Sequence, residues 1–200
     1  MIIKKINDLL FSFKKNSSKS NKIDNNTTLA LETNYPTLSY KAKESYQYLA
    51  QLCLPKNTRK NEVFEFIDTL KNYDNDDDYL STLNVFAEFL DDNDYHFIMS
   101  FDLNSETSNL AWRLNLALQE NYNLFLTLPS YEKDISISCD SVITSFDEKL
   151  RENDLQLSII DTESDEYVFL VHYINNIKHI KTAIEHIGYC LFENIASETN

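Results

Sequence analysis

The sequence predicts an α+β fold, with an N-terminal helical layer followed by helices packed on a mostly antiparallel sheet. Three observations support this prediction. Between residues 39 and 90, apolar side chains recur at every third or fourth position, which is the period of an amphipathic helix. After residue 92, several short segments alternate apolar and polar residues, which is typical of strands. Two of these segments flank a short polar turn, which indicates an antiparallel hairpin.

A tail and a linker are expected to precede the folded domain. Residues 1–15 are predicted to form an amphipathic helix, and residues 16–36 a flexible linker rich in Ser, Asn, Thr and Lys. The apolar residues of the helix fall at helical spacing: Ile2, Ile6, Leu9 and Phe13. Two interpretations of this helix stay open: it contacts a membrane surface or a partner, or it docks on the protein's own acidic body.

Residues 37–200 are predicted to form a single α+β domain that begins with three helices. Apolar stripes place these helices at residues 39–54, 60–73 and 78–90. The short connections between them favour antiparallel packing.

Strands and helices are mixed in the rest of the domain. The expected elements are a strand at 95–101, a helix at 105–121, a short strand at 123–128 and a helix at 140–152. In the first strand, Phe97, Met99 and Phe101 are expected to share one face, because side chains alternate along a strand.

The clearest strand pair is a hairpin with its turn at residues 162–165. Apolar residues alternate on both sides of the turn: Leu155, Leu157 and Ile159 before it, and Tyr167, Phe169 and Val171 after it. Val168 and Leu170 make both faces of the second strand apolar, so we expect that strand to be central. A helix at 175–187 and a strand at 189–193 complete the domain, with Gly188 suited to a left-handed helix cap.

The chain is strongly acidic, and its charge is unevenly distributed. It has 18 basic and 32 acidic residues, a net charge of −14. Residues 1–23 hold six lysines and one acid, a net +5, whereas residues 24–200 hold 12 basic and 31 acidic residues, a net −19. Such a body repels nucleic-acid phosphates and attracts basic proteins. We therefore expect a basic protein partner and no nucleic acid; acidity that serves only solubility is the alternative.

The composition argues against several classes of enzyme. Gly188 is the only glycine, so the chain has neither a glycine-rich phosphate loop nor a GxSxG nucleophile elbow. The three cysteines, Cys53, Cys139 and Cys190, form no CxxC pair, which favours a reducing, cytoplasmic compartment. Cys53 and Cys190 are expected to be buried and inert. We expect no catalytic residues and no cofactor.

Metal binding is also not expected. Asp74, Asp76 and Asp78 have the spacing of a calcium loop, but Tyr79 and Val85 stand where that loop needs Gly and Glu. His179 and His186 are seven residues apart, too far along one helix to share a zinc ion.

Three acidic clusters are the candidate partner-binding residues. They are Asp74, Asp76, Asp77 and Asp78 before the helix at 78–90, Asp91, Asp92 and Asp94 after it, and Asp161, Glu163, Asp165 and Glu166 in the hairpin. Acids after a helix C-terminus are unfavourable to its dipole, and nothing local in the sequence offsets the second cluster. A contact surface for a cationic partner explains them; solvated loops are the alternative.

An enzyme or small-ligand-binding domain of unknown chemistry is the alternative hypothesis. His96, His172 and Cys139 are the only plausible reactive residues for it, although the histidines are expected to be solvated. Trp112 falls off the main apolar stripe of its helix. Packing in or near the core is expected for it, with a partner-facing anchor as the alternative.

The second half of the chain resembles a bacterial domain family of unknown function. The resemblance covers roughly residues 80–193 and rests on three segments: the strand Phe97–Asp102 with the following Leu110–Leu114, the hairpin motif Asp-Thr-x-Ser-Asp-x-Tyr at 161–167, and the helix before Gly188. The family implies no activity. In size and acidity the chain is similar to bacterial immunity proteins that neutralise toxins, an analogy of class and not of motif. The expected function is therefore a non-enzymatic immunity protein that binds a cognate basic toxin.

Overall fold

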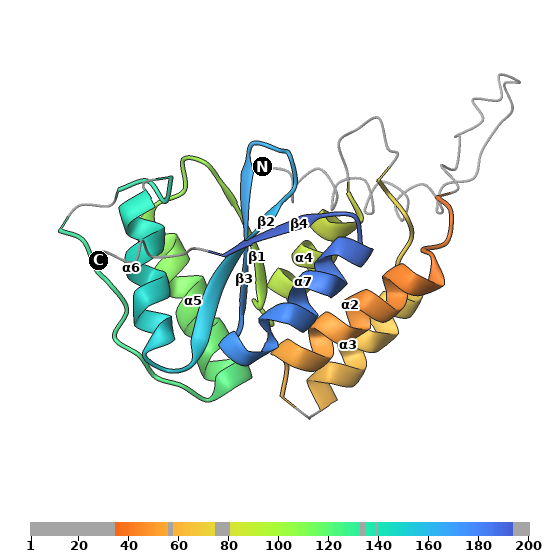
Figure 1. Ribbon diagram of the computed structural model, residues 1–200, viewed down its shortest axis with the longest axis horizontal. Helices are drawn as coiled ribbons and strands as arrows, with labels where there is room; N and C mark the ends of the chain where they lie inside the picture. The colour runs from red at the N-terminus through yellow and green to blue at the C-terminus, as the bar shows by residue number, and fades with distance from the viewer. Residues whose placement is uncertain (1–34, 56–57, 75–80, 133–134, 139, 194–200) are drawn as a thin grey trace, which may run out of the picture. The chain divides into compact units, whose positions relative to one another are not determined.

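The computed structural model describes residues 35–55, 58–74, 81–132, 135–138 and 140–193. The predicted helix at 1–15 and most of the predicted linker lie outside the described residues. The elements follow in the order α2 (Tyr40–Cys53), α3 (Thr58–Thr69), α4 (Thr82–Asp92), β1 (Ile98–Asp102), α5 (Thr107–Tyr122), α6 (Asp140–Arg151), β2 (Leu155–Asp161), β3 (Glu166–Tyr173), η1 (Ile174–Asn176), α7 (Ile177–His186) and β4 (Cys190–Glu193) (Figure 1).

The four strands form one antiparallel sheet in the order β1-β3-β2-β4. The predicted hairpin is confirmed: β2 pairs with β3, with Leu157 opposite Val171 and Ile159 opposite Phe169. The central position of the second hairpin strand is also confirmed, because β3 pairs with both β1 and β2. The α+β class predicted from the sequence is therefore correct.

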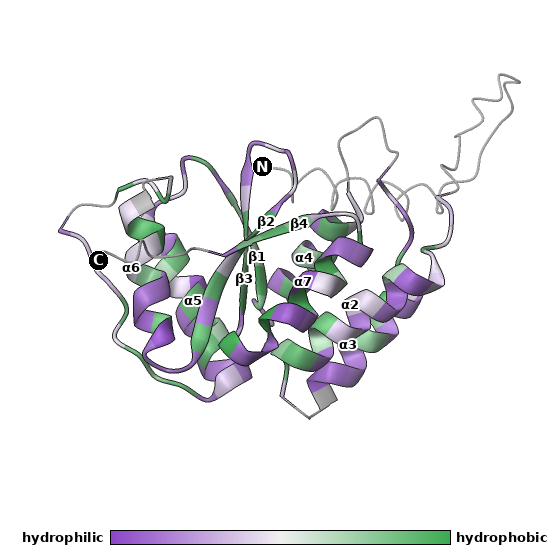
Figure 2. Cartoon of the chain, viewed as in Figure 1, coloured by the Kyte–Doolittle hydropathy of each residue, from purple (hydrophilic) through white to green (hydrophobic). Residues whose placement is uncertain are grey.

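Helices cover both faces of the sheet, and each face has its own hydrophobic core. Val168 and Leu170 of β3 pack in a core with residues of α2, α3, α4 and α7. Phe169 and Val171 of the same strand pack in a second core with residues of α5 and α6. Figure 1 shows these two groups of helices on opposite sides of the strands, and Figure 2 shows the strands as largely hydrophobic. The apolar residues on both faces of β3 explain this three-layer arrangement.

Two predictions are wrong: that Phe97, Met99 and Phe101 share one face, and that residues 123–128 form a strand. Phe97 packs in the first core and Met99 in the second, because β1 begins only at Ile98 and His96, just before it, has a left-handed backbone with φ 43°. Residues 123–128 form no strand. Asn123 ends α5 with φ 52°, and the following leucines pack on the second core instead of a sheet edge.

The only glycine has the predicted cap role. Gly188 follows the end of α7 with φ +97°, and its N–H donates to the carbonyl of Glu185. L-residues rarely adopt this conformation. The glycine thus lets the chain turn from α7 into β4.

Candidate functional site

The connection between α4 and β1 is a tight corner with two left-handed residues. Asp94 has φ 58° and His96 has φ 43°, and the N–H of Tyr95 donates to the carbonyl of Leu90 at 2.8 Å. A non-glycine residue with positive φ is under backbone strain, which the surrounding contacts must offset. The contacts made by His96 and its neighbours supply that stabilisation.

His96 is buried, with 1% of its surface exposed, between two aspartates. Its Nδ1 lies 3.0 Å from Oδ1 of Asp91, and its Nε2 lies 3.4 Å from Oδ1 of Asp94. The prediction that the histidines are solvated is therefore wrong for His96. The corner's two left-handed residues turn the ring inward, toward the end of α4.

Arg113 of α5 completes the cluster from the other side. Its Nη2 lies 2.6 Å from Oδ1 of Asp91, and its Nη1 donates to the carbonyl of Ser100 at 2.7 Å. The guanidinium also lies over the ring of Phe101, 4.5 Å from its centre. Backbone carbonyls point alternately to the two sides of a strand. The carbonyl of Phe97, three residues before Ser100, accepts the N–H of Val171 in β3. The carbonyl of Ser100 therefore points to the other side, away from β3. Arg113 thus covers the free edge of β1, where a strand could otherwise be added.

The ion pairs control the protonation of Asp91. Burial raises the pKa of Asp91, but the contacts with His96 and Arg113 outweigh it, so the pKa ends below its ordinary value. Burial lowers the pKa of Arg113, and the nearby carboxylate of Asp91 raises it by less, so the pKa ends below its ordinary value. Among the acids after α4, Asp91 is offset by a residue distant in the sequence, Arg113, and it also contacts the ring of His96.

Trp112 lies exposed beside this cluster. Its indole is 59% exposed, and its ring centre lies 6.3 Å from that of His96. The prediction of core packing for Trp112 is wrong, because α5 places Arg113, Leu110 and Leu114 toward the sheet and leaves Trp112 outside that face. The neighbouring acids Asp92 and Asp94 are also exposed. We call this surface the Trp112 corner: Asp91, Asp92, Asp94, His96, Trp112 and Arg113.

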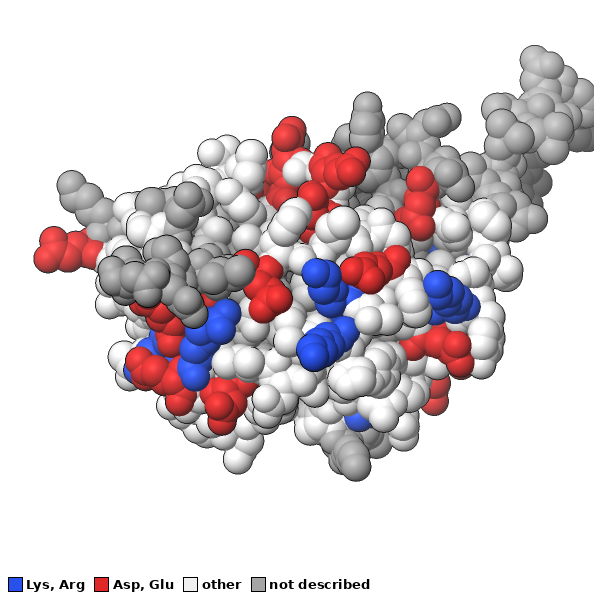
Figure 3. All heavy atoms as spheres, viewed as in Figure 1, with Lys and Arg blue, Asp and Glu red and all other residues white. Residues whose placement is uncertain are grey.

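A second acidic surface lies at the turn between β2 and β3. We call it the hairpin end: Asp102, Asp161, Glu163, Asp165 and Glu166. Asp102 stands opposite Glu166 in the sheet register, and Oγ of Ser100 donates to Glu166 at 2.8 Å. The carboxylate of Asp161 accepts the N–H of Glu163, which has φ 54°. Figure 3 shows acidic side chains gathered over the hairpin at the top of the view.

Asp102 is the member of the hairpin end that the sequence analysis missed. It ends β1, and only the pairing of β1 with β3 brings it to the hairpin. Two like charges directly opposite each other destabilise a strand pair. The hydrogen bond from Ser100 to Glu166 offsets part of that cost.

Asp74 lies at the same end of the sheet as the hairpin. Its Oδ1 accepts the N–H of Thr82 at 3.0 Å, at the start of α4. Burial raises the pKa of Tyr189, and the nearby Asp74 carboxylate raises it further; Tyr189 precedes Cys190, which stands opposite Asp161. The other members of that predicted cluster, Asp76, Asp77 and Asp78, lie outside the described residues.

The structure therefore divides the candidate acids between two ends of the sheet. The hairpin end includes the last residue of β1, and the Trp112 corner precedes the first residue of that strand. Six residues separate His96 from Asp102, which corresponds to about 20 Å along an extended chain. The two surfaces adjoin at Ser100, whose carbonyl accepts from Arg113 and whose hydroxyl donates to Glu166.

His172 and Ser158 form a buried pair on the sheet. Nε2 of His172 lies 2.9 Å from Oγ of Ser158, its Nδ1 lies 2.9 Å from the carbonyl of Tyr173, and both residues are fully buried. Burial lowers the pKa of His172. The prediction of a solvated ring is wrong here too. Sequence reasoning missed Ser158, because alternation puts it on the face opposite Leu157 and Ile159, and the local pattern does not show that helices cover both faces of the sheet.

The thiols and the metal-ligating residues provide no further cluster. Cys53 is buried as predicted, and burial raises its pKa to about 12. Cys190 is exposed, so its predicted burial is wrong; within β4 only Leu191 is buried. Cys139 lies outside the described residues. In the part of the chain that the structure describes, no three His, Cys, Asp or Glu side chains converge as metal ligands, and none of the helices is long and apolar enough to cross a membrane.

The comparisons with known proteins place the chain in a family without assigning an activity. The model of a family described as Domain of unknown function (DUF6630) matches residues 42–195. This range covers the described helices and strands from α2 to β4 almost completely. No curated protein and no solved structure matches the chain.

Proposed function

The chain belongs to the DUF6630 family, and we propose that it is a non-enzymatic acidic protein that neutralises a basic bacterial toxin by binding it. The observation on which this proposal depends is Trp112, which is 59% exposed, lies beside His96 and precedes Arg113, the residue that pairs with Asp91. Tryptophan is prominent among the residues that dominate binding energy in protein interfaces.

The Trp112 corner is suited to the contact itself. An interface anchor binds best when its geometry is fixed before association, because less conformational freedom is then lost. Arg113 and Trp112 are consecutive on α5, and Arg113 is tied to α4 and to β1 at the same time. The indole therefore extends from a braced part of the helix, with Asp92 and Asp94 available to pair with cations of the partner.

The hairpin end is suited to long-range attraction. Residues 24–200 carry a net charge of −19, and such a field accelerates the approach of a basic protein. Glu163 and Asp165 are exposed, so they contribute to the field at little cost in desolvation. In this proposal Asp91 stabilises the corner, while the exposed acids attract the partner.

The proposal places the protein in the cytoplasm, where a neutralising protein would meet a toxin that acts on intracellular targets. Cys53 and Cys190 are free thiols, which suits a reducing compartment. The acidity and the modest size of the chain support the analogy with immunity proteins.

A capture experiment with matched variants tests the proposal. The tagged full-length protein is incubated with lysate of the source organism, and bound proteins are identified by mass spectrometry. We expect one stoichiometric basic partner that is lost with Trp112→Ala and retained with Phe125→Ala. Phe125 is a good control because it is 78% exposed and lies beyond the end of α5, away from the Trp112 corner. A partner that binds both variants equally would refute the role of Trp112.

A further inference from the structure

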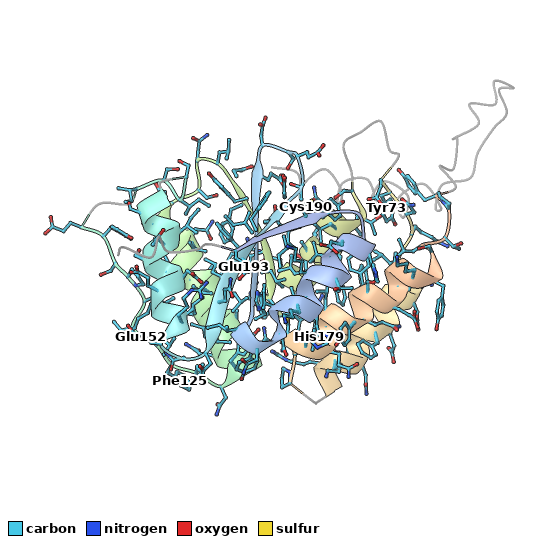
Figure 4. All side chains as sticks on the ribbon, viewed as in Figure 1. Tyr73, Phe125, Glu152, His179, Cys190 and Glu193 are labelled. Carbon is cyan, nitrogen blue, oxygen red and sulfur yellow. The ribbon has the colours of Figure 1, made fainter. Side chains whose placement is uncertain are left out.

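The two edges of the sheet are covered differently. At one edge, the carbonyl of Ser100 in β1 accepts a hydrogen bond from Arg113. At the other edge, β4 pairs with β2 and with no other strand in the part of the chain that the structure describes. Figure 1 shows β4 in front of the other strands, and Figure 4 labels Cys190 and Glu193 at its two ends. Backbone N–H and C=O groups on the free side of such a strand can pair with another strand.

The side chains of β4 leave apolar surface exposed at this edge. Leu191 packs in the first core, whereas Phe192 is 55% exposed. Phe192 stands opposite Ile159 of β2, a residue that packs on the second core and is itself only half-buried. Apolar surface therefore continues from β2 onto β4 and is exposed at the edge. Soluble proteins often protect such an edge with charged residues, and Glu193 is the only charged residue of β4.

Helix α7 packs beside β4 and presents three exposed charged residues: Lys178, Lys181 and Glu185. We call them the α7 stripe. At about 100° per residue, the three lie within about 60° of one another around the helix axis. They are centred about 120° from His179 and His186, which face α2. The α7 stripe therefore lies on a different side of the helix from α2.

The α7 stripe is complementary to a second copy of itself. It reads Lys, Lys, Glu along the chain, and none of the three forms an ion pair within the described residues. When two such helices lie side by side in opposite directions, the lysines of each lie near the glutamate of the other.

The charge at this edge favours a second copy over a basic partner. Together with Glu193, the α7 stripe holds two basic and two acidic residues, so these four have no net charge, although the chain has a net charge of −14. A basic protein would find no excess of acid among them. Opposite charges that match each other in reverse order suit the self-complementary surface of a symmetric dimer.

We propose that two copies of the chain associate through β4 and α7, with their sheets joined into one antiparallel sheet of eight strands, four from each copy. A two-fold axis perpendicular to the sheet pairs β4 with β4 of the second copy in opposite directions. The same axis places both α7 helices on one face, side by side and antiparallel. Phe192 of each copy then packs against β4 of the other. Because β4 has only four residues, strand pairing alone is weak, and the α7 contacts add to it.

This association goes beyond the proposed function and does not depend on it. The Trp112 corner adjoins β1, at the opposite edge of the sheet from β4. The dimer therefore leaves that corner free to bind a partner.

Sedimentation velocity of the full-length protein tests the proposal. Over concentrations from about 1 μM to about 500 μM, we expect the average sedimentation coefficient to rise from that of a monomer to that of a dimer. A protein that stays monomeric over this range would overturn the proposal.

Charge reversal on the α7 stripe should separate the two copies. The double variant Lys178→Glu and Lys181→Glu places like charges near Glu185 of the second copy, so the dissociation constant should rise about tenfold or more. Adding Glu185→Lys restores opposite charges across the axis, and this triple variant should recover dimerisation.

The control for that series is Lys41→Glu with Lys43→Glu, which makes the same change in net charge on α2. It should change the dissociation constant by less than about threefold, because its charges lie away from the contact. The proposal fails if this control weakens the dimer as much as the stripe variant does, or if the triple variant stays monomeric.

Phe192→Gln tests the strand edge itself. It removes exposed apolar surface that the second copy would cover, so the dissociation constant should rise about fivefold or more. Phe125→Gln is the matched control, because Phe125 is 78% exposed and lies in the segment after α5. Equal effects of the two substitutions would contradict association through β4.

Discussion

Arg113 is the residue that connects most of the Trp112 corner. It contacts Asp91 at the end of α4 and Ser100 in β1. Replacement by Met keeps much of the side-chain volume but leaves a half-buried carboxylate and an edge carbonyl without their partner. We expect Arg113→Met to lower the free energy of unfolding by about 2–3 kcal/mol, measured by urea denaturation.

A surface ion pair provides the comparison for that variant. Lys149 pairs with Glu152 on the exterior of α6, so Lys149→Met should cost less than about 1 kcal/mol. Equal losses in the two variants would mean that the Arg113 cluster contributes no more than an ordinary surface pair.

His172 makes stability depend on pH. Its pKa in the folded protein lies below the ordinary value of 6.5, because the ring is buried. As pH falls through 6.5 toward that lower pKa, the unfolded chain binds a proton that the folded protein does not, so stability falls. We expect the free energy of unfolding to decrease between pH 7.5 and 5.5, by up to about 1 kcal/mol per pH unit from this residue.

Substitution isolates the contribution of His172. His172→Gln should flatten the pH dependence in this interval, and the same substitution at the exposed ring of His186 is the matched control. Urea denaturation at several pH values measures both. An unchanged slope in His172→Gln would contradict the assignment of this proton to the buried ring.

At the scale of elements, the turn from α7 into β4 depends on Gly188. A Cβ at this position would meet no atom within 4 Å, so the cost of a side chain there comes from the backbone alone. With φ +97°, Gly188→Ala should destabilise the protein by about 1 kcal/mol. Gly188→Asn should cost less, because Asn tolerates left-handed conformations better. Thermal unfolding of the two variants checks the order, and an Ala variant as stable as wild type would contradict it.

The elements that the sequence predicted correctly are those whose pattern is local. The apolar residues on both faces of β3 were enough to predict its central place, and the alternation around residues 162–165 was enough to predict the hairpin. The strand predicted at 123–128 fails because a strand needs a neighbour, and local composition does not show whether one is present. The apolar pattern of α5 also did not decide whether Trp112 is buried or exposed, because its exposure depends on which face of α5 meets the sheet.

The candidate site was harder to predict because its contacts join distant segments. Asp91 and Arg113 are 22 residues apart, and nothing near Asp91 in the sequence indicates its cationic partner. The inward turn of His96 depends on left-handed backbone at two non-glycine residues, which composition does not reveal. By contrast, the acidity of the hairpin was visible directly, and only its neighbour Asp102 required the strand pairing.

At the scale of the whole molecule, the two acidic surfaces have different roles in binding. The double charge reversal Glu163→Lys and Asp165→Lys, at the hairpin end, should slow association with the captured partner several-fold at low salt and reduce its salt dependence. Dissociation should change little. Surface plasmon resonance at several salt concentrations measures both rates.

The control reverses an acid away from both surfaces. Glu152 follows α6, and within the described part of the chain its one ion pair is with Lys149. For each charge reversed, Glu152→Lys should lower the association rate less than the double reversal at the hairpin end does. If the rate falls in proportion to net charge in all variants, the hairpin end has no special role.

The most direct test of the account is whether the protein neutralises the partner that it captures. The captured protein is expressed alone in a suitable host, and then together with the wild-type chain, Trp112→Ala or Phe125→Ala. The account predicts that the partner alone stops growth, that the wild type and Phe125→Ala restore it, and that Trp112→Ala does not. A partner that is harmless alone, or growth restored equally by Trp112→Ala, would contradict it.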